Sequence, residues 1–143
     1  MKVTDFVMDY MNQAEIRLET AEMALNKKAY AYCIRQCQES VELCLKAALR
    51  LIGIDYPKWH DVGVVLEKEK GRFPSEFQAA VSKLVSISKF LAAQREAAMY
   101  GEEISKRSPS SLFSKENAVE ALEHAKFTYS KLEKLVKDAS ETN

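Results

Sequence analysis

The chain has 143 residues, of which 47% are hydrophobic and 29% charged, enough for one domain with a buried core. Its 21 basic and 21 acidic residues cancel, which argues against a general nucleic-acid coat protein without excluding a local basic patch. No apolar run approaches the roughly 18 residues of a membrane span, and acidic residues near the start do not suit a signal peptide. We therefore expect a soluble, cytoplasmic protein with no membrane partner.

Two long helices are predicted first. The first begins at Thr4 or Asp5, either of which can cap it. Its apolar residues follow one another in alternating steps of four and three, the spacing of a helical-bundle seam: Val7, Met11, Ala14, Leu18, Ala21 and Leu25. The second helix runs from about Ala29 to Leu51, and Gly53 suits its end. It carries a second apolar stripe and is therefore placed at the centre of the bundle: Leu45, Leu49 and Ile52.

Cys33, Cys37 and Cys44 share one face of this second helix. No second cysteine cluster is present in the sequence, so a disulfide framework is not expected. Free cysteines buried in the core are the simpler interpretation. Two of them, one turn apart, could supply half of a zinc site, which only His60 and His124 could complete. We predict no metal and no cofactor.

The remaining elements follow in order. A short third helix is predicted over about 62–70, with Asp61 as its cap, and a fourth over about 75–99. The polar segment 102–112 is predicted as the longest loop, and long loops in compact domains are often functional. A fifth helix is predicted to begin after Ser114.

These elements predict an all-α fold: an antiparallel up-and-down bundle of about five helices, four long and one short. We assign the whole of 1–143 to a single domain, with its core over about 5–137 and a frayed tail at 138–143. No strand-like alternation of useful length and no internal repeat competes with this prediction.

Three polar features are candidates for function. Glu42 and Lys46 lie one turn apart, either as an ordinary ion pair or as the polar wall of a groove. His60 is either a polar residue beside the Asp61 cap or a group for acid–base chemistry near neutral pH.

The third feature is the end of the fourth helix, where Arg95 and Tyr100 lie before the polar loop. Arg95 either shields the last helical carbonyl groups or binds phosphate, because a planar guanidinium can hold two phosphate oxygens. Tyr100 either packs at the bundle end or stacks on a base. Phosphate-cradling glycine loops and known hydrolase motifs are missing from the sequence.

The order of these motifs resembles the HEPN domain family. The resemblance rests on four segments: Tyr10, Ala14, Leu18 and Ala21; the Gln38–Leu49 stretch; the Pro-x-x-His-Asp segment Pro57–Asp61; and Arg95 near the end of the fourth helix. It implies a helical bundle that is usually a homodimer. Many family members are metal-independent ribonucleases with an Arg-x4-6-His motif shared between two subunits. Others partner a minimal nucleotidyltransferase, often in toxin–antitoxin pairs, and some are thought to bind nucleotides.

This sequence departs from that motif. The histidine would fall at Tyr100, Gly101 or Glu102, so the imidazole that suits proton transfer at an RNA 2′-hydroxyl is missing. Tyrosine, with a pKa near 10, is a poor general base at pH 7. The sequence thus predicts no catalytic residue, and binding of a nucleotide or nucleic-acid phosphate at Arg95. The alternatives are a variant endoribonuclease that uses His60 or Tyr100, and a purely structural interaction module.

Overall fold

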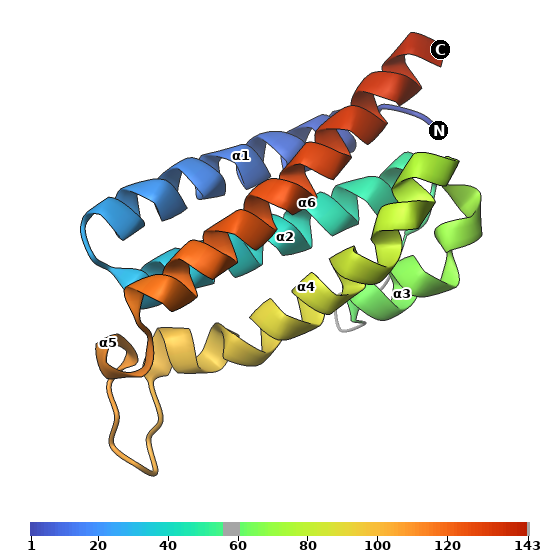
Figure 1. Cartoon of the computed structure of the whole chain (residues 1–143). Helices are drawn as coiled ribbons and strands as arrows, with labels where there is room; N and C mark the ends of the chain where they lie inside the picture. Colours follow the sequence, from blue (N-terminus) through green and yellow to red (C-terminus); the bar gives the residue numbers. More distant parts are fainter. Residues whose placement is uncertain (56–60, 143) are drawn as a thin grey trace.

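The computed structural model describes residues 1–55 and 61–142, and in these parts of the chain the fold is an all-α bundle (Figure 1). Successive long helices run in opposite directions, which confirms the antiparallel up-and-down arrangement. The elements are α1 (Asp5–Asn26), α2 (Tyr30–Leu51), α3 (Val62–Lys68), the 3-10 turn η1 (Lys70–Arg72), α4 (Ser75–Tyr100), α5 (Pro109–Leu112) and α6 (Lys115–Thr142).

The helix α1 begins where the sequence predicts. The Thr4 hydroxyl accepts a hydrogen bond from the Val7 amide at 3.3 Å, satisfying one of the free N–H groups at the helix start. The predicted apolar stripe is buried except at its end, where Ala24 is buried and Leu25 only half-buried.

The helix α2 lies at the centre of the bundle, as predicted, and packs against α1, α3, α4, α5 and α6. Leu45, Leu49 and Leu51 are fully buried along it. A buried hydrogen bond, 2.9 Å long, joins the Ser40 hydroxyl to the carbonyl oxygen of Ala14 and fixes α2 against α1. The position of α2 follows from its two apolar stripes, which require cover on more than one side.

The structure differs from the prediction at three places in the chain. The third helix ends at Lys68, and η1 follows it as a tighter turn. The predicted loop contains α5, a four-residue helix with Pro109 at its first turn, where proline is tolerated. The described part of the tail is helical: α6 continues to Thr142, and Ala139 is fully buried.

Ser114 caps the start of α6, as the sequence predicts. Its hydroxyl accepts a hydrogen bond from the backbone amide of Asn117, and the side-chain oxygen of Asn117 accepts one from the backbone amide of Ser114. Within the described parts of the chain, no helix carries an apolar stretch long enough to span a bilayer.

The cysteines of α2 are free and buried, so we expect slow thiol chemistry. Burial raises the pKa of the Cys44 thiol to about 12, which keeps it protonated at neutral pH. Native protein should react with Ellman's reagent at least about 1,000-fold more slowly than the chain unfolded in guanidinium, because access requires unfolding. Equal rates in a stopped-flow absorbance assay would contradict this expectation.

Candidate functional site

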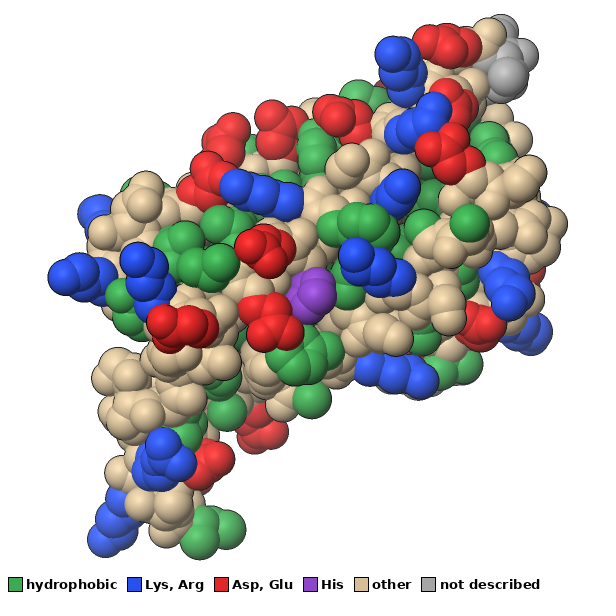
Figure 2. Space-filling model, viewed as in Figure 1, with side chains coloured by type: hydrophobic (Ala, Val, Ile, Leu, Met, Phe, Trp, Pro, Cys, Tyr) green, Lys and Arg blue, Asp and Glu red, His purple; other side chains and the backbone are tan. Residues whose placement is uncertain are grey.

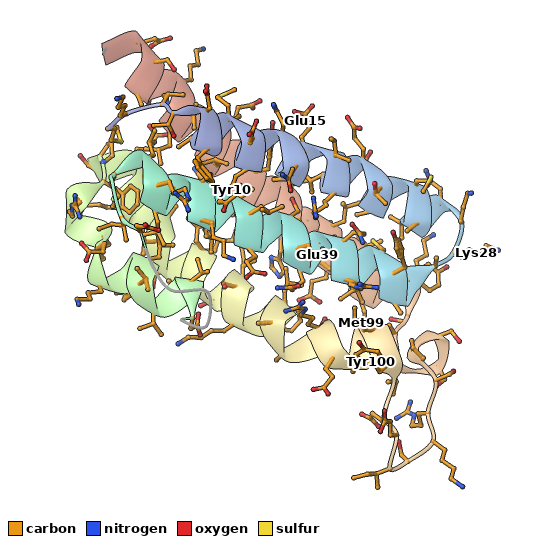
Figure 3. The ribbon with its side chains drawn as sticks, turned by 180° about the vertical axis from the view of Figure 1, so that it is seen from behind. Tyr10, Glu15, Lys28, Glu39, Met99 and Tyr100 are labelled. Carbon is orange, nitrogen blue, oxygen red and sulfur yellow. The ribbon has the colours of Figure 1, made fainter. Side chains whose placement is uncertain are left out.

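One polar stripe runs along the central helix on the side that α1 and α4 leave open. It consists of residues spaced three or four apart, so they share a face: Arg35, Glu39, Glu42, Lys46 and Arg50. We call it the α2 polar stripe. Figure 3 shows this side of α2 between α1 and α4, with Glu39 on it. All five side chains are half-buried, so their contacts lie partly out of solvent.

Glu42 lies at the middle of the α2 polar stripe. Its Oε1 atom is 3.1 Å from Lys46 Nζ, and its Oε2 atom accepts a hydrogen bond of 3.3 Å from Gln38 Nε2. The structure thus brings together the two sequence-predicted residues Glu42 and Lys46 and adds Gln38 to them. The lysine balances the charge of the carboxylate.

Glu39 joins the stripe to α1. Its carboxylate lies 3.5 Å from Arg17 Nε and 3.8 Å from Arg35 Nε, and it accepts a hydrogen bond from Gln36. Because Arg17 belongs to α1, this cluster holds the two helices together in the partly buried setting where ion pairs count for more than at a fully exposed surface.

A pocket of about 120 Å³ opens beside the stripe, between α2, α3 and α4. Its apolar lining comes from all three helices: Val41, Val62, Leu91 and Ala92. Its polar lining is rich in oxygen acceptors: Gln38, Glu42, Asp61 and Ser88. Asp61 caps α3 as predicted, since its Oδ1 atom accepts from the Gly63 amide at 2.8 Å.

Gln38 is the polar residue of this pocket that sequence reasoning missed. Its side chain is only 6% exposed, and its buried Oε1 atom has no hydrogen-bond partner among the described residues. An unsatisfied buried acceptor costs about 1–3 kcal/mol. The available signal was its register: Gln38 lies in line with Ile34 and Val41, on the apolar side of α2, where a glutamine is unusual.

Arg95 lies next to the pocket, one helical turn beyond Leu91 and Ala92 in its wall. Its side chain is exposed, and no hydrogen bond or ion pair joins it to another described residue. A guanidinium without such a partner keeps all five donors available to solvent or to an anion.

Tyr100 lies apart from Arg95. Five positions along one α-helix rotate the side-chain direction by about 140°. Tyr100 is 64% exposed at the end of α4, where Figure 3 also labels Met99. A shallow hollow surrounds it that includes three acidic residues, Glu96, Glu102 and Glu103. Negative charge there repels phosphate, so the two predicted residues do not form one phosphate site.

The three positions where a ribonuclease motif would place its histidine differ from one another in backbone conformation and in the space for a side chain. Gly101 has φ of +76°, and a Cβ atom built on it would overlap the backbone carbonyl oxygen of Arg107. Glu102 exchanges two backbone hydrogen bonds with Arg107, which closes the loop. Of the three positions, only Gly101 lacks space for an imidazole, because the Glu102–Arg107 bonds are made by the backbone and leave the exposed side chain of Glu102 unconstrained. The remaining candidate, His60, lies outside the described residues.

One face of the molecule carries charges of both signs. On the face shown in Figure 2, lysine and arginine side chains are interspersed with aspartate and glutamate. This pattern differs from the continuous basic surface typical of nonspecific nucleic-acid binding. Among the described residues, no group of three or more histidine, cysteine, aspartate or glutamate side chains could hold a metal ion.

The fold and the site together define a class of protein. It is an all-α antiparallel bundle with a small pocket rich in hydrogen-bond acceptors and an exposed arginine near the end of the long helix α4. The HEPN domain matches residues 7–135, nearly the whole chain. The chain therefore belongs to the HEPN domain family, which confirms the resemblance seen in the sequence.

A solved structure shows the same fold. The chain is similar to the crystal structure of TT1696 from Thermus thermophilus, with a TM-score of 0.70 and 20% sequence identity over 92% of this chain and 98% of that chain. At this identity the similarity supports the fold alone. No curated protein shows significant similarity to the chain.

Proposed function

We propose that this HEPN-family protein binds a nucleotide, or a nucleic-acid phosphate, at Arg95. The observation that carries the proposal is the exposed Arg95 guanidinium, which has no described ion-pair partner and lies one turn from a preformed pocket. Arginine holds phosphate through paired, charge-assisted hydrogen bonds. Glu42, which is paired with Lys46, lines the pocket from α2. Tyr100 has no role in this site.

The proposed role is binding without RNA cleavage. General acid–base catalysis needs a group that titrates near neutral pH within reach of the 2′-hydroxyl. Of the motif positions, Tyr100 carries a phenol, Gly101 lacks space for a side chain, and Glu102 lies in the loop closure. Cleavage of single-stranded or structured RNA by metal-free protein would contradict this part of the proposal.

The proposed assembly is a homodimer, since HEPN domains often act as dimers. A minimal nucleotidyltransferase is the proposed partner protein, in a toxin–antitoxin type of pair. Size-exclusion chromatography with light scattering tests the dimer. Co-expression and co-purification with the nucleotidyltransferase encoded beside this protein, where such a neighbour is present, tests the partner.

Calorimetric titration with ATP, GTP and short RNA tests the phosphate site. Arg95→Ala should weaken binding about 10- to 100-fold, because a hydrogen bond to a charged group contributes roughly 1.5–3 kcal/mol. Lys89→Ala is the matched control: it removes another exposed cation from α4, on a different side of the helix, and should change affinity little. Equal binding by wild type and Arg95→Ala would exclude this site.

A further inference from the structure

We infer that the pocket between α2, α3 and α4 binds the exocyclic amino group of a nucleobase, with Gln38 Oε1 as the acceptor. The inference names the class of base that the pocket selects, and it rests on the proposed function only for the phosphate at Arg95. The inference is based on the Gln38 side chain, which is 6% exposed and lines the pocket. Its Oε1 atom has no hydrogen-bond partner among the described residues.

The orientation of the Gln38 amide follows from its neighbour. The Glu42 carboxylate is an acceptor only, so the NH2 end of the glutamine must face it, at 3.3 Å. Rotation of the amide by 180° would set a carbonyl oxygen against a carboxylate oxygen. The Glu42 contact therefore keeps Oε1 as the free end, and the group that satisfies it must donate a hydrogen bond.

Charge indicates that this donor is neutral. The carboxylate of Glu42 is already paired with Lys46 Nζ at 3.1 Å, whereas Asp61, which accepts from the Gly63 amide at Oδ1, keeps its negative charge. The exposed Arg95 adds positive charge nearby, which disfavours a cationic ligand. A neutral amino group attached to an aromatic ring donates a hydrogen bond without adding charge.

The size and walls of the pocket fit a ring. Its volume of about 120 Å³ corresponds to roughly four water molecules at ~30 Å³ each, below the ~300 Å³ at which small-molecule sites begin. One base edge fits, and the sugar and phosphate must remain outside. Apolar side chains from the lining helices, among them Val62 of α3 and Leu91 of α4, can contact the ring.

The position of Arg95 matches this binding mode. It follows Leu91 and Ala92 of the pocket wall by one turn, which is a displacement of about 5 Å along the helix axis. For a base held at Gln38, we therefore expect the phosphate group to extend toward the exposed Arg95.

This arrangement predicts selection of amino-bearing over oxo-bearing bases. Adenine and cytosine carry an amino group where hypoxanthine and uracil carry a carbonyl oxygen. That oxygen would face Gln38 Oε1, and two buried acceptors without a donor between them are unfavourable. Each pair also differs at the neighbouring ring nitrogen, which is an acceptor in the amino base and carries N–H in the oxo base, so the Gln38→Met variant is needed to isolate the Gln38 contact.

The experiment compares nucleosides that lack phosphate. We expect wild-type protein to bind adenosine at least about tenfold more tightly than inosine, and cytidine at least about tenfold more tightly than uridine, in NMR titrations that follow the side-chain amide signals. Gln38→Met, which keeps the length but removes the acceptor, should abolish this preference. Gln36→Met is the matched control, because Gln36 lies on the same helix and bonds to Glu39 outside the pocket.

The outcomes separate the two proposals. Equal binding of amino and oxo nucleosides by wild type, or no nucleoside binding, overturns the inference whatever the variants do. Inorganic triphosphate tests Arg95 by itself: if it binds and nucleosides do not, the proposed function stands and the inference falls. If nucleosides bind selectively and triphosphate does not bind, the inference stands and the proposed phosphate site at Arg95 falls. A preference that persists in folded Gln38→Met protein would also overturn the assignment of Gln38.

Discussion

Leu49→Ala is expected to lower the free energy of unfolding by about 2–5 kcal/mol. Leu49 is fully buried on α2, the helix that packs against the other long helices of the bundle. The substitution removes apolar surface from the core and leaves a cavity that neighbouring helices fill only partly. Because a domain of this size has about 5–15 kcal/mol of stability, the loss should be large in a urea unfolding curve.

The control for this prediction is Ile16→Ala on α1. Ile16 is 58% exposed, so its truncation should change stability by less than about 0.5 kcal/mol. A Leu49→Ala effect as small as the Ile16→Ala effect would show that α2 is not the packed centre of the molecule.

The second large effect is expected from Gly101→His, which should lower the free energy of unfolding. This glycine has φ of +76° and ψ of −162°, a backbone region that essentially only glycine adopts and where strain costs other residues about 1–3 kcal/mol. A side chain there would also overlap the carbonyl oxygen of Arg107, so the loop between α4 and α5 must move. We expect lower stability in urea unfolding, together with faster hydrogen exchange at the amides of Glu102 and Arg107, whose mutual bonds close that loop.

Tyr100→His gives the matched comparison, because it introduces the same side chain one position earlier. Tyr100 is 64% exposed and helical, so the change should be almost neutral for stability. If both histidine variants unfold at the same urea concentration and protect the loop amides equally, the account of Gly101 is wrong.

The bundle could be predicted from sequence because apolar steps of three and four recur over four long segments, and burial in α1 and α2 follows them closely. Short elements were less predictable. The four residues of α5 are too few to show a helical repeat, and the only sequence signal for this helix is Pro109, which lies in its first turn. The extension of α6 to Thr142 depends on the burial of Ala139, a tertiary contact.

The candidate site was predictable only in part. Glu42 and Lys46 pair because their spacing on a helix brings them together whatever surrounds them. Closeness in sequence did not bring Arg95 and Tyr100 together, since five helical positions turn their side chains apart. The burial of Gln38 depends on α3 and α4, which pack against α2 from distant parts of the chain.

The buried amide of Gln38 has a thermodynamic consequence for the protein as a whole. An acceptor without a donor is a cost carried by the unliganded folded state, and an apolar residue of similar shape would avoid it. A ligand that supplies the donor removes that cost only in the folded protein, and binding to the folded form alone raises stability by mass action. If the inferred base contact forms, the sequence at this position trades conformational stability for recognition, as proteins commonly do where a binding site interrupts a core.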